Sequence, residues 1–164
     1  QKWVLGGWEI AGTAVFQSGL IIQNQGANLS VNFDPIGLSG GYTNRPNING
    51  HMHYAKTQKE WFNPSVFSTP TPAWAGAPNQ GFGNARKDTA LGPGTTNFNT
   101  ALYKNFPIKE RANFQFRFET FNTFNHTEFN NVGATYQGPG SGNFGQVTNT
   151  QDPRVLELGA ILNF

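Results

Sequence analysis

The sequence contains no cysteine. Disulfide bonds, zinc sites built on cysteine and thiol nucleophiles are therefore all excluded. The same absence says little about the cellular compartment, because a chain without cysteine can reside in a reducing or an oxidising one.

Charged side chains are also scarce, at 12% of the residues. The 11 basic and 9 acidic side chains are scattered along the chain and give a net charge of +2. Proteins that bind nucleic acid gather lysine and arginine on one face, where these side chains follow the phosphate backbone. No such cluster is present, so we do not expect a nucleic acid partner.

Long hydrophobic runs are missing too. No stretch of about 18 apolar residues occurs, which excludes a transmembrane helix, and the mean hydropathy is −0.47. These two observations would ordinarily indicate a soluble protein. Strands of membrane barrels escape this test, because they alternate lipid-facing with lumen-facing residues and so have little net hydropathy.

The residues that are plentiful favour strands and turns. Aromatic residues make up 14% of the chain, which includes 15 Phe, and there are 20 Gly and 10 Pro. Disordered chains are poor in aromatic residues, and helical domains are rich in Ala, Leu, Glu and Lys. We therefore predict an all-β chain with turn-rich loops.

Four segments alternate between apolar and polar residues with a period of two, as strands do. The alternation predicts strands near residues 8–18, 97–106, 112–124 and 154–164. The last segment matches the about 9 to 11 residues that a tilted membrane strand needs. Residues 23–96 are rich in Asn, Gly and Pro and show no sustained period, so we expect a long loop there within a single segment, 1–164.

The alternation also assigns side chains to two faces. We predict that one set faces lipid, or packs against other copies of the chain, and that a second set faces an aqueous lumen. The lipid-facing or self-packing residues are Phe114, Phe116, Phe118, Leu156, Leu158, Leu162 and Phe164. The lumen-facing residues are Gln115, Arg117 and Glu119. A hydrocarbon exterior and a watery interior require this division of side chains.

Other chemistry is weakly indicated. His51 and His53 with Glu60 nearby are ordinary zinc ligands by type, but an HxH pair in a loop is usually only a loop, and we predict no metal site. The glycine clusters lack the helix that a phosphate-binding loop requires. His126 has no recognisable nucleophile partner, and no carboxylate pair has a spacing typical of acid–base catalysis. We therefore expect no enzyme activity and no cofactor.

The order of several segments resembles one family. The segments are GGWEIAGTAVFQSG, RPNING, WFNPSVF, FGNARKDTALGPG, NFNTALYKNF, FQFRFETFNTFNHTEF and FGQVTNTQDPRVLELGAILNF. This series is similar, nearly from end to end, to the C-terminal portion of the Oar-like TonB-dependent receptors with a carboxypeptidase-regulatory-like N-terminal domain. An amphipathic last strand ending in Phe164 also resembles the signal by which outer-membrane barrels are recognised for insertion.

The resemblance implies a wall segment of a transporter or receptor in the bacterial outer membrane. It implies a large barrel of about 22 strands, with an N-terminal plug and an energy-coupling box that these 164 residues do not contain. Gln1 is not an initiator methionine and no signal peptide follows it, so we expect an internal start. The expected fold is the C-terminal, antiparallel, amphipathic part of a barrel, incomplete by itself. Its expected partners are outer-membrane lipid and the rest of the parent barrel.

Two alternatives remain from the sequence. Four strands leave open edges, so an isolated fragment could pair with identical copies of itself and form a β-rich extracellular filament. A soluble β-sandwich that binds a ligand ranks lower, because the long irregular stretch and the faces of the strands both disfavour it.

Overall fold

The computed structural model describes residues 2–22, 29–35, 37, 42–76, 81–108 and 112–164. The chain divides into two compact units. We call the first the sheet unit (Gln1–Gln17, Thr95–Glu128 and Gln151–Phe164) and the second the loop unit (Ser18–Gly94 and Phe129–Thr150). The described fold is all-β apart from α1 (Lys2–Leu5) and two short 3-10 helices, η1 (Pro64–Val66) and η2 (Ala73–Ala75). None of the helices in the described residues is long and apolar enough to cross a membrane.

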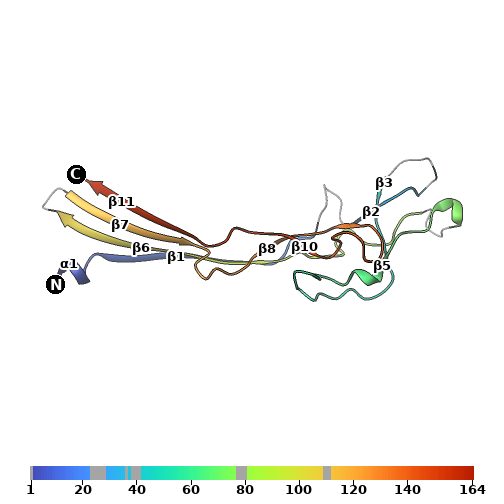
Figure 1. Cartoon of the computed structure of the whole chain (residues 1–164), viewed down its shortest axis with the longest axis horizontal. Coiled ribbons are helices and arrows are strands. Elements are labelled where there is room, and N and C mark those ends of the chain that lie inside the picture. Colours follow the sequence, from blue (N-terminus) through green and yellow to red (C-terminus); the bar gives the residue numbers. More distant parts are fainter. Residues whose placement is uncertain (1, 23–28, 36, 38–41, 77–80, 109–111) are drawn as a thin grey trace. The chain divides into compact units, whose positions relative to one another are not determined.

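The sheet unit is one antiparallel sheet of four strands in the order β1-β6-β7-β11, which lie side by side in Figure 1. The strands are β1 (Trp8–Gln17), β6 (Thr95–Ile108), β7 (Ala112–Phe121) and β11 (Val155–Asn163). Within the described residues, β1 pairs only with β6 and β11 pairs only with β7. The sheet is therefore open at both edges and does not close into a barrel.

The register places residues of one parity together across all four strands. Leu102 lies opposite both Ile10 and Phe118, and Phe118 lies opposite Leu158. Directly opposed residues of an antiparallel pair project from the same side of the sheet. Even-numbered residues of all four strands thus share one side, which we call the apolar face, and odd-numbered residues share the other, which we call the polar face.

The strands differ from their predicted limits mainly at their ends. β6 is longer than the predicted 97–106, because Thr95 and Thr96 pair with Gln17 and Phe16. β7 stops at Phe121, before the predicted end at 124, because Asn122 adopts a positive φ of 51° that interrupts an extended strand.

In the described residues, the loop unit contains four short strands where the sequence predicted a loop at 23–96, and three more between residues 129 and 150. The strands are β2 (Ser30–Phe33), β3 (Tyr42–Asn44), β4 (Asn47–Ile48), β5 (Phe67–Ser68), β8 (Phe129–Val132), β9 (Thr135–Tyr136) and β10 (Val147–Thr150). They form three small sheets, ordered β3-β2-β9, β4-β5 and β10-β8. Each strand is too short to show a period of two, which is why the sequence pattern missed them.

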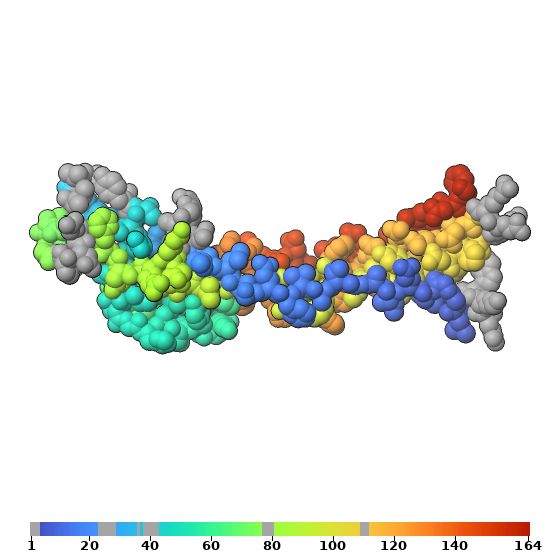
Figure 2. Space-filling view, turned by 180° about the vertical axis from the view of Figure 1, so that it is seen from behind, coloured from blue at the N-terminus to red at the C-terminus, as the bar shows by residue number. Residues whose placement is uncertain are grey.

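The loop unit has a hydrophobic core of its own, and Figure 2 shows its cyan and green residues packed into one continuous body. Phe62 is completely buried and contacts Phe144 edge to face, with ring centroids 5.3 Å apart. Phe144 also packs against Phe67 and Tyr136. Such edge-to-face pairs add to the stabilisation that burial gives. The core thus joins residues of the 61–67 region to residues of the 132–144 region.

We expect Phe62→Ala to destabilise the loop unit by about 3 to 5 kcal/mol, because the ring fills a space that its neighbours cannot close. Phe82→Ala is the matched control, since Phe82 is 58% exposed in the same unit. Hydrogen exchange of amides in β8 and β9 should accelerate strongly in the first variant and little in the second. Equal exchange in both variants would contradict the central place of Phe62.

Candidate functional site

Six of the seven residues predicted to face lipid lie on the apolar face. Phe114, Phe116 and Phe118 alternate along β7, and the register sets Leu162, Ala160 and Leu158 opposite them on β11. Leu156 lies opposite Thr120 on the same face. Phe164 follows the end of β11 at Asn163 and is 99% exposed. The structure places these six side chains on one surface. That this surface faces lipid, or other copies of the chain, stays a prediction.

The apolar face extends across β6 and β1, which sequence periodicity could not show, because a period within one strand does not fix the register with the next. Its further large residues are Trp8, Ile10, Phe16, Phe98, Leu102 and Phe106. Ile10 and Leu158 are 79% and 71% exposed. Figure 2 shows the strands of this sheet from behind, with β1 in blue beside the yellow residues of β6. A broad apolar surface of this kind marks a contact with lipid or protein.

Aromatic rings gather near both ends of the apolar face. At the end where β1 begins and β7 begins, the rings of Phe106 and Phe114 lie 5.9 Å apart. At the other end, Phe98 makes edge-to-face contacts with Phe16 and Phe124, at 5.4 and 5.2 Å. Membrane barrels carry aromatic girdles at the two ends of their apolar band.

Lys104 is the only charged residue among the described strand residues of the apolar face, and it is buried. Its Nζ donates to the backbone oxygens of Val4, at 3.2 Å, and of Gly6. The ammonium also lies 4.8 Å from the centre of the Trp8 ring and 5.3 Å from that of Phe106. Carbonyl oxygens and aromatic faces both stabilise a cation that has left water. The sequence showed Lys104 on an apolar parity but gave no sign of these partners.

The three residues predicted to face the lumen lie together on the polar face of β7. Arg117 Nε donates to Gln115 Oε1 over 2.6 Å, and the guanidinium lies over the Tyr103 ring at 5.3 Å. Tyr103 in turn donates its hydroxyl to Glu119 Oε1 over 3.1 Å. These contacts join the predicted residues through Tyr103, which the sequence pattern had not singled out.

Neutral amides continue the network toward the β6–β7 connection. Gln115 Nε2 and Asn113 Nδ2 both donate to Asn105 Oδ1, at 2.9 and 3.2 Å. Across β11, Glu157 lies directly opposite Glu119, a pairing of like charges that is tolerated best in water. Gly159 lies opposite Arg117 and leaves room for its aliphatic stem. The polar face is thus hydrogen-bonded along β7 and acidic beside it.

The connection after β7 is held by a buried carboxylate. Glu128 accepts a hydrogen bond from the Thr96 backbone N–H at 3.1 Å, and its other oxygen lies 2.8 Å from His126 Nδ1. Asn122 accepts from the His126 N–H and donates to the His126 carbonyl oxygen. The His126–Glu128 pair has the side chains of a possible catalytic dyad, but its contacts hold the loop after β7 in place.

The residues weighed as metal ligands come only partly together. His53 Nε2 lies 4.0 Å from Glu60 Oε1, and both side chains are substantially exposed. In the part of the chain that the structure describes, no three His, Cys, Asp or Glu side chains could jointly hold a metal ion.

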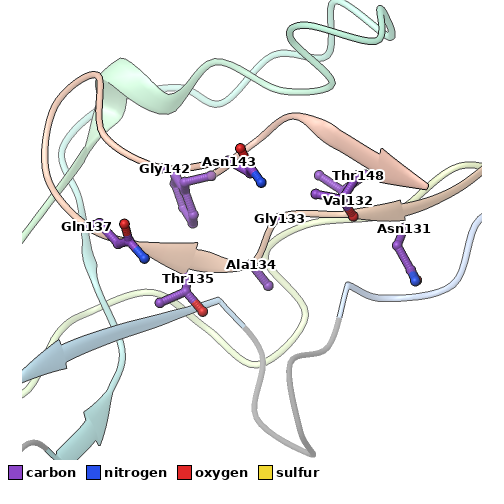
Figure 3. Close-up of a pocket in the computed structure, with 10 residues that line it drawn as sticks. Asn131, Val132, Gly133, Ala134, Thr135, Gln137, Gly142, Asn143 and Thr148 are labelled. Atoms are coloured by element: carbon purple, nitrogen blue, oxygen red, sulfur yellow. The ribbon is translucent and has the colours of Figure 1, made fainter.

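An open groove of about 430 Å³ lies in the loop unit, between residues 131–135 and the returning segment 142–148 (Figure 3). Its polar lining residues are Asn131, Thr135, Gln137, Asn143 and Thr148. None of its ten lining residues is charged, so the groove offers neutral hydrogen-bonding groups.

Comparison with known proteins gives one match. A family model described as an outer membrane beta barrel domain matches residues 1–157. No curated protein matches the chain, and no solved structure does.

We expect Glu128→Ala to lower the free energy of unfolding of the sheet by about 1 to 3 kcal/mol, because the Thr96 N–H then lacks its acceptor. Glu128→Gln should cost less, since an amide oxygen can still accept. The Thr96 amide should exchange faster in the alanine variant. Glu157→Ala, which removes an exposed carboxylate, is the control. An equal loss of stability in this variant would show that the Glu128 contact with Thr96 does not stabilise the sheet.

Proposed function

Because the chain belongs to the family of outer membrane β-barrel domains, we propose that it forms part of the wall of a TonB-dependent outer-membrane transporter or receptor and is not itself catalytic. The observation that carries this proposal is the register of the four strands. It joins the alternating residues of all four strands into one apolar and one polar face. A barrel wall between hydrocarbon and water needs both faces.

In this proposal the apolar face contacts the acyl chains of outer-membrane lipid. Ile10, Leu158 and Leu162 are all more than half exposed, which water would penalise and lipid would not. The aromatic rings at the two ends of the face suit the boundaries between hydrocarbon and water, where aromatic side chains are enriched. Phe114 lies at the end near Phe106, and Phe116 and Phe118 lie between the two ends.

The polar face is then directed to the lumen. Gln115, Arg117 and Glu119 hydrogen-bond along the wall in a network with Tyr103 and Asn105. This arrangement leaves the side chains on the surface of the wall, where they can contact water, a plug or a solute.

The remaining strands of the wall must come from elsewhere in the barrel. The described sheet has four strands, and about eight are needed to close even a small filled barrel. The free edges of β1 and β11 therefore pair, in our proposal, with neighbouring strands of the parent barrel.

Connection lengths give the orientation. β6 and β7 are joined by residues 109–111 alone, whereas β1 and β6 are joined by residues 18–94. Barrels of the bacterial outer membrane have short turns on the periplasmic side and long loops on the extracellular side. We therefore place the loop unit outside the cell and the β6–β7 connection in the periplasm.

TonB dependence is the more specific part of the proposal. It is supported by the resemblance of the ordered segments, from GGWEIAGTAVFQSG to the C-terminal strand, to the Oar-like receptors. Assembly of an isolated chain into filaments stays a prediction. It is motivated by the open edges of β1 and β11, which could pair with other copies of the chain.

We expect Phe116→Arg to destabilise the assembled barrel by about 2 to 4 kcal/mol, because an arginine near the midplane of the lipid face is costly. The matched control is Gln115→Arg, one residue away on the polar face, which should cost much less. Unfolding of the purified full-length protein in lipid, followed by tryptophan fluorescence, measures both. Equal losses of stability in Phe116→Arg and Gln115→Arg would contradict the assignment of the two faces.

Deleting Phe164 from the full-length protein should reduce the amount of barrel inserted into the outer membrane, because an aromatic residue directly after β11 is part of the proposed insertion signal. Heat-modifiable mobility on gels reports the folded barrel directly. The control is Phe164→Tyr, which keeps an aromatic ring and should insert nearly as well. Unchanged barrel levels after the deletion would make the residue incidental.

A further inference from the structure

The apolar face contains one side chain that does not belong in a hydrocarbon environment. Lys104 lies in the second half of β6 (Thr95–Ile108), with Trp8 opposite on one side and Phe116 on the other. Among the described strand residues of this face, it is the only charged one. A lysine exposed to acyl chains is unfavourable unless the ammonium reaches the interface or finds partners. Lys104 is only 4% exposed, so it has found partners.

The oxygen partners of Lys104 come from the end of α1 and the residue just after it. The carbonyl oxygens at the C-terminal end of a helix have no partners within the helix. Here Val4 O accepts from Lys104 Nζ and from the Trp8 indole N–H, the latter at 2.9 Å, and Gly6 O accepts from Lys104 as well. The ammonium thus connects α1, β1 and β6.

The turn between α1 and β1 fixes this geometry. Gly7 has a φ of 75°, and its carbonyl oxygen accepts from the Asn105 N–H at 2.8 Å. A Cβ at this position would lie 2.6 Å from Asn105 O, so only glycine fits. The chain therefore reverses at Gly7 and places α1 beside Lys104 on β6.

We infer that α1 is a membrane-surface latch, which Lys104 holds on the apolar face and whose Val4 and Leu5 side chains contact phospholipid. The inference rests on the proposed function, because it requires the apolar face to meet lipid. Val4 and Leu5 are 70% and 77% exposed although both are apolar. A helix of one turn is not stable alone in water, so its position depends on the contacts with Lys104 and Trp8.

Phospholipid is the occupant that this arrangement fits. Trp8 combines an apolar ring with an N–H donor, which suits the depth where acyl chains meet headgroups. The positive charge of Lys104 is enclosed by oxygens and rings before it reaches the acyl chains. The two exposed side chains of α1 then continue the apolar surface to the boundary of the bilayer.

The test uses the full-length protein in phospholipid vesicles, with any native cysteine outside this segment replaced and a nitroxide attached at Leu5→Cys. The chain itself has no cysteine, so its label is unique. The label should be immobilised and should collide severalfold more often with oxygen, which dissolves in lipid, than with a water-soluble nickel chelate. Preference for the chelate would overturn the inference, with no need of a further variant.

Lys104→Met tests the latch, because it keeps the aliphatic stem and removes the ammonium. The Leu5 label should then become mobile and collide severalfold more often with the chelate, and Lys104→Arg should restore most of the original behaviour. Lys87→Met, at an exposed lysine of the loop unit, should change nothing. An immobile, lipid-accessible Leu5 label in Lys104→Met would show that Lys104 does not hold α1.

A second label separates this inference from the proposal beneath it. At Leu158→Cys, in the middle of β11, the label reports whether the apolar face meets lipid at all. Oxygen preference at Leu158 with chelate preference at Leu5 would overturn the latch alone. Chelate preference at Leu158 would overturn the lipid-facing assignment and the latch with it.

Discussion

The backbone pairing of β6 with its two neighbours determines the chemistry of the whole sheet. Because Leu102 is opposite both Ile10 and Phe118, most of the large apolar residues of β1, β6 and β7 fall on the same side. A shift of one residue in either pairing would move the charged and amide side chains of one strand among the aromatic rings of the next. The hydrogen bonds of the strands and the separation of polar from apolar side chains therefore specify the same register, and each stabilises the other.

The sequence predicted the four long strands because each one alternates within itself, and a period of two is visible without knowing any neighbour. It also assigned Phe114, Phe116 and Phe118 and the intervening Gln115, Arg117 and Glu119 to opposite sides of β7. It could not predict Tyr103 as the link between Arg117 and Glu119, because that contact depends on the pairing of β6 with β7. The oxygen partners of Lys104 were hidden for the same reason, since Val4 lies 100 positions away in the sequence and Gly6 lies 98.

The loop unit escaped prediction for a different physical reason. Its order comes from contacts between separate segments, such as Phe62 with Phe144, and not from any repeating pattern within a segment. Short strands such as β4 and β9 contribute few hydrogen bonds, so the buried aromatic rings and the backbone contacts around them supply much of the stabilisation. Glycines at crowded positions are part of this packing. A Cβ on Gly133 would lie 2.0 Å from Asn143 O, so no other residue allows the two segments to approach so closely.

The two units use the same residue types under opposite conditions of solvation. In the loop unit, Phe62, Phe67 and Phe144 are buried against one another, so the unit itself removes these rings from water. In the sheet unit, apolar side chains such as Ile10 and Leu158 stay exposed, because a single sheet has nothing of its own to place on that face. The same difference in solvation accounts for the cover of Lys104, which contacts α1, while charged residues on the polar face such as Glu157 are exposed. In the proposed barrel wall, only the medium at the apolar face fails to solvate a charge.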